Sequence, residues 1–245
     1  MPRLDRVTAL LLCGGQGLRA WPLTEDVPKP LIDVSGKRLM EYVMELMADQ
    51  GVTRFVLAAG RAHLQVSRFA RSLDRPWDVQ VAATGDKAET WQRVVACRKL
   101  LSEPFFLAYS DCLANIDLDE VRKIHERNAA LGTITVAPML SQSGLVDVEP
   151  TGKVMSFTEK PWLSGQLINI GFMMIDRELL NDKAVEQARS LEREVLPYAA
   201  KTGRLFAHRH QGFYKTVDTY KDATELREMV EAKSLPWLAG ELAGI

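Results

Sequence analysis

The feature that most constrains the fold is an alternation of short apolar runs with longer segments whose apolar residues recur at helical spacing. In the first part of the chain, apolar runs at 7–13, 54–59, 77–82, 105–109 and 132–137 alternate with helix-like segments at 37–50, 62–73, 87–101 and 118–130. The run at 7–13 is continuously apolar, which is typical of a strand buried on both faces. Strands joined by helices of this length need crossover connections and predict a mainly parallel sheet.

The pattern changes after about residue 140. The segments expected there are, in chain order, a β-hairpin with strands at 145–149 and 154–158 around the turn Pro-Thr-Gly-Lys, a strand at 167–175, a helix at 191–200, a strand at 204–208 and a helix at 220–232. No repeat, low-complexity tract or linker is found. We therefore expect one α/β domain over residues 1–245, with a doubly wound, mainly parallel mixed sheet of Rossmann-like type and a more antiparallel second half.

Composition excludes several classes of protein. The chain has 245 residues, 47% of them hydrophobic and 26% charged, and its net charge is −1. Because acidic and basic residues alternate without a basic block, we expect no nucleic-acid partner. No run of 18 apolar residues and no signal-peptide pattern occur, so we expect no membrane partner and a cytoplasmic location. The three cysteines (Cys13, Cys97 and Cys112) contain no C-x-x-C pair and suggest neither a disulfide framework nor a zinc site.

The run at 7–13 leads directly into GGQGLRAWPLTEDVPKPL, residues 14–31. The stretch GQGLRA formally matches the dinucleotide fingerprint, which requires a helix that begins inside the glycines and an acidic residue at the end of the next strand. Pro22, Pro28 and Pro30 resist helix formation here, and the next strand ends in Ala-Ala-Gly. The P-loop pattern is absent as well. Neither of these two phosphate-binding devices is expected.

The loop nevertheless predicts a site for phosphates. Glycines allow the backbone to approach a ligand closely and to turn several N–H groups toward an anion. Arg19 and Lys29 add positive charge from the two ends of the same loop. This supply of donors and charge suits a triphosphate.

Two aspartates follow predicted apolar segments. Asp111 comes directly after the run at 105–109, and Asp218 lies in the sequence KTVDTY. Ligands of doubly wound sheets bind at the carboxyl ends of the strands, where both residues are expected. Two carboxylates can share one Mg²⁺, which prefers oxygen ligands and phosphate partners. For Asp218 the alternative is an N-cap, because a helix is expected from about residue 220.

The loop resembles that of the sugar-1-phosphate nucleotidylyltransferases, or nucleotide-sugar pyrophosphorylases, which reads approximately G-G-x-G-x-R-x-x-P-L-T followed by P-K-P-L. Further similar stretches are YSDCLANIDL and TVDTYKD, which look like the metal motifs of the family, FTEKP at 157–161, which looks like its F-x-E-K-P, and LINIG at 167–171, which looks like its I-N-x-G. The resemblance spans roughly residues 7–230.

This resemblance implies that a sugar 1-phosphate attacks the α-phosphorus of a nucleoside triphosphate, giving an NDP-sugar and pyrophosphate. About residues 1–140 would bind the nucleotide and about 141–245 the sugar phosphate. The residues implied are Arg19, Lys29 and Asp111 for catalysis, Asp111 and Asp218 for Mg²⁺, Leu12, Gly14, Gly15, Gly17, Thr84 and Gly85 for the nucleotide, and Gly144, Glu159, Lys160, Asn169 and Gly171 for the sugar phosphate. The family also implies a homo-oligomer.

Several alternatives stay open at this point. The substrate could be a non-sugar phosphate or phosphonate, or the chain could bind nucleotide sugars without catalysis. TGD at 84–86 and the two aspartate motifs resemble glucose-1-phosphate cytidylyltransferases, whereas PLTEDVPKPL looks more like thymidylyl-, uridylyl- or guanylyl-transferring relatives. Heptose-1-phosphate guanylyltransferases are similar in length. The identities of the nucleotide and of the sugar are therefore not predicted.

Overall fold

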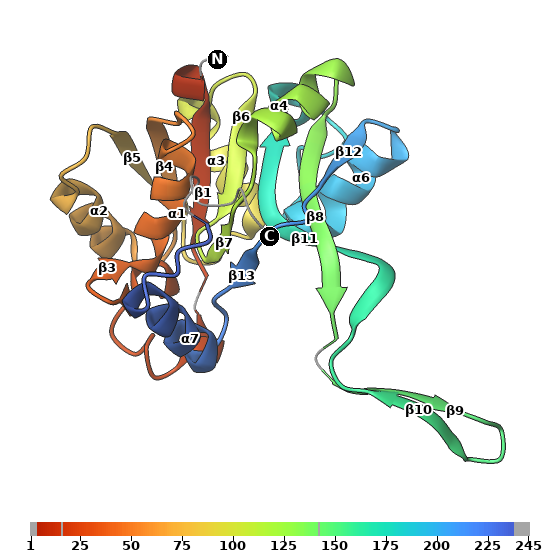
Figure 1. The fold of residues 1–245 in the computed structure, drawn as a ribbon. Coiled ribbons are helices and arrows are strands. Elements are labelled where there is room, and N and C mark those ends of the chain that lie inside the picture. Colours follow the sequence, from red (N-terminus) through yellow and green to blue (C-terminus); the bar gives the residue numbers. More distant parts are fainter. Residues whose placement is uncertain (1–3, 16, 142, 238–245) are drawn as a thin grey trace.

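The computed structural model describes residues 4–15, 17–141 and 143–237. Its centre is a seven-stranded sheet in the order β12-β8-β11-β6-β1-β4-β5 (Figure 1). These strands are β1 (Thr8–Cys13), β4 (Arg54–Ala59), β5 (Asp78–Ala83), β6 (Phe105–Tyr109), β8 (Gly132–Leu140), β11 (Trp162–Ile175) and β12 (Leu205–Arg209). Strand β11 runs antiparallel to β6 and β8, while the other neighbouring pairs are parallel. The expected mainly parallel mixed sheet is confirmed.

Strand β1 lies inside this sheet, between β4 and β6, and all six of its residues are buried. Its side chains alternate between two hydrophobic clusters. Leu11 belongs to the first cluster, whereas Leu10 and Leu12 belong to the second. A strand that packs on both faces must be apolar throughout, which explains the unbroken run in the sequence.

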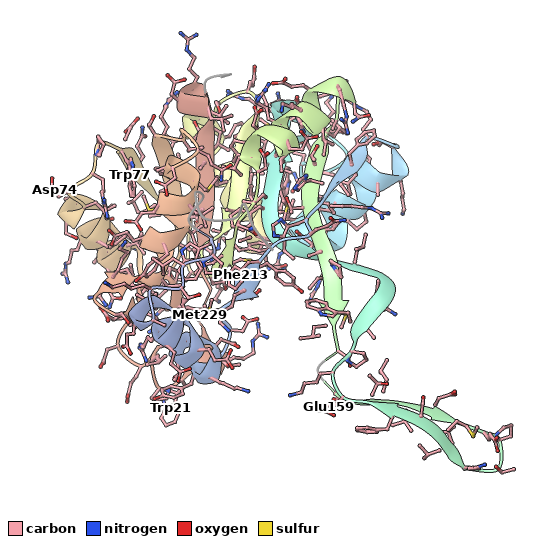
Figure 2. All side chains as sticks on the ribbon, viewed as in Figure 1. Trp21, Asp74, Trp77, Glu159, Phe213 and Met229 are labelled. Atoms are coloured by element: carbon pink, nitrogen blue, oxygen red, sulfur yellow. The ribbon has the colours of Figure 1, made fainter. Side chains whose placement is uncertain are left out.

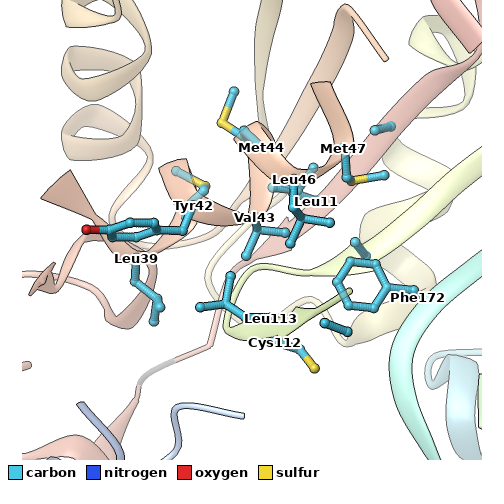
Figure 3. Packing of buried hydrophobic residues seen from close by; sticks show 14 of the residues in the cluster. Leu11, Leu39, Tyr42, Val43, Met44, Leu46, Met47, Cys112, Leu113 and Phe172 are labelled. Carbon is cyan, nitrogen blue, oxygen red and sulfur yellow. The ribbon is translucent and has the colours of Figure 1, made fainter. Parts of the chain in front are cut away.

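Helices cover both faces of the sheet. They are α1 (Leu39–Ala48), α2 (His63–Ser72), α3 (Thr90–Ala96), α4 (Leu118–Arg127), α5 (Arg177–Asn181), α6 (Leu196–Lys201) and α7 (Tyr220–Glu231). Helix α1 packs Val43 and Met47 into the same cluster as Leu11 and Phe172 (Figure 3). Helix α3 contributes the fully buried Trp91 to the other cluster. Among the described helices, none has the length and apolar character that a membrane crossing requires.

The helix expected at 191–200 is not a single regular helix. A π-helical turn, η5 (Leu191–Val195), comes first, and α6 continues from Leu196. In the turn, the Val195 N–H bonds to the carbonyl of Ser190, five residues earlier. Pro197 follows at the start of α6, and a proline ring inside an α-helix would clash with the carbonyl four residues before it. The wider π turn avoids this clash.

Two other expected helices are shorter than their periodicity suggested. For the segment at 87–101, a capping box between Glu89 and Gln92 starts α3 at Thr90, and the helix gives way to a short 3-10 turn, η4 (Arg98–Leu100). For the segment at 37–50, the first two residues form β3 (Lys37–Arg38), which pairs with β2 (Asp33–Val34). Side-chain capping and local strand pairing thus set boundaries that apolar spacing alone does not reveal.

Two small antiparallel pairs lie outside the main sheet. Strand β7 (Cys112–Ala114) pairs with β13 (Tyr214–Thr216) beside the carboxyl end of β6. Strands β9 (Leu145–Val148) and β10 (Val154–Thr158) form the expected hairpin. This hairpin extends away from the body of the molecule (Figure 1).

Protonation of His125 is expected to destabilise the fold. The His125 ring is buried on α4 with Nδ1 3.2 Å from Thr133 Oγ1, and burial lowers the pKa of His125 below 6.5. Above that pH the ring is neutral in both states. Below it the unfolded chain binds the proton more readily, so the free energy of unfolding falls as the pH decreases. In urea titrations at about pH 7.5 and about pH 5.5, the loss of stability should be smaller in His125→Gln than in the wild type.

The control for this experiment is His63→Gln, because His63 lies half exposed at the start of α2. This variant should retain the full loss of stability between the two pH values. An equal loss in His125→Gln would show that other groups cause the acid sensitivity.

Candidate active site

The carboxyl ends of β1 and β6 border a cavity of about 900 Å³. Its lining residues are Leu12, Gly14, Gly15, Lys29, Pro30, Ala88, Glu89, Thr90, Arg93, Tyr109, Ser110, Asp111, Cys112, Asn169, Ile170, Ser190, Glu192, Arg193, Thr216 and Asp218. This volume lies within the range of about 300–1,000 Å³ that is usual for small-molecule sites. The position is the one expected for ligands of doubly wound sheets.

Lys29 lies between the two aspartates. Its Nζ is 2.6 Å from Asp111 Oδ2 and 2.6 Å from Asp218 Oδ1. The Lys29 side chain is 11% exposed, so its charge is largely withdrawn from water. The residue begins a short 3-10 turn, η3 (Lys29–Leu31), between two prolines, which fixes the direction of the backbone at this point. One ammonium group therefore neutralises two converging carboxylates.

The β7–β13 pair brings the two aspartates together. Cys112 of β7 lies opposite Thr216 of β13, and the Val217 N–H donates to the Asp111 carbonyl at 2.9 Å. Asp111 and Asp218 thus flank the same end of this short ladder. Neighbouring strands lie about 4.8 Å apart, which places two side chains at this end within reach of one cation.

Asp218 does not cap the following helix, so that alternative is wrong. Thr219 is the N-cap of α7, and its side chain forms a capping box with Asp222. Asp222 also accepts from the Asp218 N–H at 3.0 Å. The Asp218 carboxylate is consequently left to bind cations.

Arg19 reaches the same carboxylate from the glycine loop. Its Nη2 lies 3.0 Å from Asp218 Oδ1, but the side chain is 76% exposed. An ion pair this open to water contributes little to stability. The guanidinium therefore lies beside the site but is only weakly restrained there.

Arg93 fixes the glycine loop at its first residue. Its Nη2 donates to the Gly14 carbonyl at 3.2 Å, and its Nη1 donates to Thr84 Oγ1 at 2.6 Å and to the Gly85 carbonyl at 3.1 Å. A Cβ at position 14 would lie only 2.1 Å from Arg93 Cζ, so any other residue there would displace the guanidinium from this position. Burial lowers the pKa of Arg93, and all three acceptors are uncharged oxygens.

Arg93 was not among the expected site residues, although it lines the cavity. The sequence presents it as one cation within an amphipathic helix, and nothing local distinguishes it from a surface arginine. Thr84 and Gly85 were expected at the nucleotide. Both accept hydrogen bonds from Arg93, which lines the cavity, but neither residue is itself among the lining residues.

Gly17 packs against Lys29, which lies further along the same loop. Gly17 has a φ of +65°, and a Cβ on it would lie 2.8 Å from Lys29 Cβ. Thr24 Oγ1 donates to the Gly17 carbonyl at 3.0 Å and closes the turn. A glycine at this position therefore permits the loop to fold back onto the lysine.

Asn169 and Gly171 lie on β11, where the pairing with β8 shifts register. Asn169 lines the cavity, and its Oδ1 accepts from the Gly171 N–H at 3.0 Å. Gly171 has a φ of +86°, and a Cβ there would lie 2.5 Å from Cδ2 of Tyr109. Gly171 thus acts on the site indirectly, because it leaves room for the Tyr109 ring that lines the cavity.

Glu192 is a second lining residue that was not expected. Its carboxylate accepts from the Tyr109 hydroxyl, from Thr90 Oγ1 at 2.7 Å and from Ser190 Oγ at 3.1 Å. Burial alone would raise the pKa of Glu192, but these hydrogen bonds outweigh burial and lower it. The residue lies in the π-helical turn, so its direction depends on that irregular backbone.

Three expected sugar-phosphate residues lie outside this cavity. Gly144, Glu159 and Lys160 are at the root of the β9–β10 hairpin, where Figure 2 labels Glu159. A Cβ at Gly144 would lie 2.5 Å from the Phe157 ring and 3.0 Å from Glu159 Oε2. Glu159 and Lys160 are both exposed. The described structure brings these three residues near one another but not to Lys29.

Cys112 is buried beside Asp111, and its thiol donates to the Ile170 carbonyl at 2.8 Å. Burial raises the pKa of this thiol to about 12. A thiol that stays protonated is a poor nucleophile, so Cys112 has a packing role.

This combination of fold and site defines a class of enzyme. The chain belongs to the nucleotidyl transferase family, which it matches over residues 8–231. The expectation of a sugar-1-phosphate nucleotidylyltransferase, drawn from the glycine loop and the two aspartate motifs, is confirmed at the level of the family.

Particular relatives differ in the names of their substrates. A protein of Bacillus subtilis (strain 168) named "Probable glucose-1-phosphate cytidylyltransferase" is 30% identical over 94% of this chain and 98% of its own length. The mannose-1-phosphate guanyltransferase beta-B of Xenopus laevis is 30% identical over 87% of this chain and 62% of its own length. The crystal structure of HddC from Yersinia pseudotuberculosis has a TM-score of 0.73 at 21% identity, covering 91% of this chain and 99% of that chain, and it confirms the fold.

Replacement of Gly171 should destabilise the protein more than replacement of another left-handed glycine. In Gly171→Ala the new methyl group meets the Tyr109 ring in addition to the strain of a positive φ. The matched control is Gly152→Ala, because Gly152 has a φ of +85° and a methyl group added there would meet nothing within 4 Å. We expect the free energy of unfolding, measured in urea, to fall by about 1–3 kcal/mol more in Gly171→Ala. Equal losses in the two variants would contradict the proposed contact.

Proposed function

We propose that the cavity holds a nucleoside triphosphate and a sugar 1-phosphate end to end, and that the sugar phosphate attacks the α-phosphorus while pyrophosphate leaves in line. The main support for this proposal is that Lys29 forms ion pairs with both Asp111 and Asp218 beside the glycine loop. The substrate classes come from the names of the relatives. Consumption of nucleoside triphosphates also suits the cytoplasm as its location.

The attacking oxygen already carries negative charge, so no general base is required. The barrier consists of bringing two anions together and of stabilising the charge that develops at phosphorus. Lys29 supplies positive charge in the lining of the cavity, and Arg19 supplies it from the exposed side of Asp218. Gly14 and Gly15 line the same cavity, and Arg93 holds their loop through the Gly14 carbonyl.

The donor set also fits Mg²⁺. In the described part of the chain, no three His, Cys, Asp or Glu side chains gather as a metal site. Two carboxylates do converge, which is the number that Mg²⁺ commonly uses when substrate phosphates and water complete its shell. Asp111 and Asp218 would hold the ion, and when bound it would supply charge neutralisation between the two substrates.

Lys29 occupies the position between these carboxylates, so it competes with any divalent cation for them. A divalent cation and the Lys29 ammonium group would repel each other strongly in this space. If Asp111 and Asp218 held the ion, the Lys29 ammonium would be available to bind a substrate phosphate in the cavity that Lys29 lines. Lys29 would thus neutralise the paired carboxylates in the absence of metal and contact a phosphate in its presence.

The sugar end of the cavity is assigned to Asn169 and to the wall formed by Tyr109 and Glu192. Gly144, Glu159 and Lys160 remain candidates for the sugar phosphate through the resemblance of FTEKP. Cytidylyl and guanylyl transfer are both suggested by relatives at 30% identity, so similarity does not select the base.

Pyrophosphate release tests this function. We expect release with at least one pairing of CTP, GTP, UTP or dTTP with a sugar 1-phosphate, and a loss of about 10²-fold or more in kcat for Asp111→Asn and for Lys29→Ala. The controls are Asp74→Asn and Lys201→Ala, which change exposed residues away from the cavity and should keep normal turnover. Binding of nucleotide sugars without release from any pair would instead indicate a binding protein.

The competition between Lys29 and the metal predicts a second result. In the absence of nucleotide, Lys29→Met should bind Mn²⁺, followed by electron paramagnetic resonance, roughly tenfold or more tightly than the wild type. Arg19→Met is the control, because the exposed guanidinium touches only one of the two carboxylates. Its Mn²⁺ affinity should change less. Unchanged or weaker binding in Lys29→Met would contradict the competition.

A further inference from the structure

Two segments that lie far apart in the chain interlock at one wall of the cavity. The first is the start of α3, at 89–92, and the second is the stretch at 189–192 that leads into the π-helical turn. The Trp91 N–H donates to the Arg189 carbonyl at 2.9 Å, and the Arg189 guanidinium pairs with the Glu89 carboxylate at 2.9 Å. The start of α3 and the π-helical turn are therefore fixed to each other.

Thr90, the first residue of α3, links these segments to the lining of the cavity. Its Oγ1 accepts from the Leu191 N–H at 2.9 Å and donates to Glu192 Oε2 at 2.7 Å. One hydroxyl group thus orients both the backbone of the turn and the carboxylate beside it. Ser190 Oγ donates to the same Oε2 at 3.1 Å, and the Tyr109 hydroxyl donates to Oε1. Three hydroxyl groups therefore hold the Glu192 carboxylate in one orientation.

The Glu192 carboxylate keeps its negative charge without a cationic partner. Within the residues that the structure describes, no Lys, Arg or His nitrogen lies within 4 Å of it, and its side-chain donors are the three hydroxyl groups. These hydrogen bonds lower the pKa of Glu192, so the group is ionised at neutral pH. A carboxylate that is not neutralised repels a phosphate. The part of a ligand that meets Glu192 must therefore not be anionic and must supply hydrogen-bond donors, and sugar hydroxyl groups meet both requirements.

We propose that Thr90 is a positioning residue for the sugar, because its hydroxyl holds the Glu192 carboxylate where that group accepts a hydrogen bond from a sugar hydroxyl. This inference rests on the proposed function, which places the sugar at this wall of the cavity. Thr90 acts through Glu192 and not on the reacting phosphates, which are expected at Lys29. Its hydroxyl group should therefore matter for binding of the sugar and little for binding of the nucleotide.

The nucleotide end of α3 is anchored separately. Arg93, one turn further along the helix, makes three hydrogen bonds to the glycine loop and to the residues that follow β5. None of these bonds involves Thr90. The capping box between Glu89 and Gln92 also starts the helix without the Thr90 hydroxyl. Removal of this hydroxyl group therefore separates the sugar end of the cavity from the nucleotide end.

Isothermal titration calorimetry with nucleotide sugars tests the proposal without turnover. The probes are CDP-glucose and GDP-mannose, each compared with CDP or GDP alone. Thr90→Val removes the hydroxyl group at nearly constant volume. It should weaken the binding of the better nucleotide sugar roughly tenfold and change the affinity for the diphosphate less than about twofold. Thr90→Ser keeps a hydroxyl group and should restore the binding of the nucleotide sugar.

Thr151→Val is the matched control. The Thr151 hydroxyl also donates to a carboxylate, Glu149 Oε2 at 3.3 Å, but Thr151 lies outside the cavity. This variant should bind nucleotide sugars as the wild type does. Circular dichroism and thermal unfolding check that the variants fold, and Thr90→Ala takes the place of Thr90→Val if the valine variant loses the native fold.

A double-mutant cycle tests whether Thr90 acts through Glu192. In a Glu192→Ala background, Thr90→Val should cost less than about twofold in further affinity for the nucleotide sugar, because the carboxylate that it positions is gone. The proposal is overturned by equal losses in the two backgrounds or by an equal loss of affinity for the diphosphate. It is also overturned if Thr90→Val binds nucleotide sugars normally, or if the wild type binds them no more tightly than the diphosphates.

Pyrophosphate release separates this inference from the proposed function. A protein whose binding of nucleotide sugars depends on Thr90 as expected, but which releases no pyrophosphate from any substrate pair, contradicts the catalytic proposal alone. A protein that releases pyrophosphate, with the same KM for the sugar 1-phosphate in Thr90→Val as in the wild type, contradicts the role of Thr90 alone.

Discussion

The contact on which this site depends is the ammonium group of Lys29 between two carboxylates. Each of its distances to Asp111 and Asp218 is 2.6 Å, and the lysine is almost entirely withdrawn from solvent. Two carboxylates at this separation would repel each other strongly without a cation between them. A protein that keeps them together must therefore keep a positive charge there, and Lys29 supplies it in this structure.

The walls of the cavity follow from close backbone approach. Gly14 admits the Arg93 guanidinium, Gly17 admits Lys29, and Gly171 admits the Tyr109 ring. In each case a methyl group would occupy space that a functional side chain needs. The glycines thus contribute to the site by leaving room for these side chains, two of which (Arg93 and Tyr109) come from distant parts of the chain.

The β9–β10 hairpin shows both what local sequence predicts and what it does not. Its strands and turn were predicted from local sequence, and the structure confirms them. The orientation of the hairpin relative to the main sheet was not predictable, because the short motif FTEKP carries no information about that orientation. Glu159 and Lys160, expected at the sugar phosphate, lie at the root of this hairpin and do not line the cavity.

The amino-acid sequence by itself determined the order of strands and helices, the unbroken burial of β1 and the need for glycine in the loop, because these depend on short-range periodicity and backbone freedom. It did not reveal Arg93 or Glu192, whose local patterns are those of ordinary helical surface residues. Nor did it reveal the π-helical turn before Pro197. Only the tertiary structure decided that residues 82 and 189 positions away from Lys29 would bind its ammonium group. Such contacts require the complete sheet and the β7–β13 ladder, since no local interaction spans those separations.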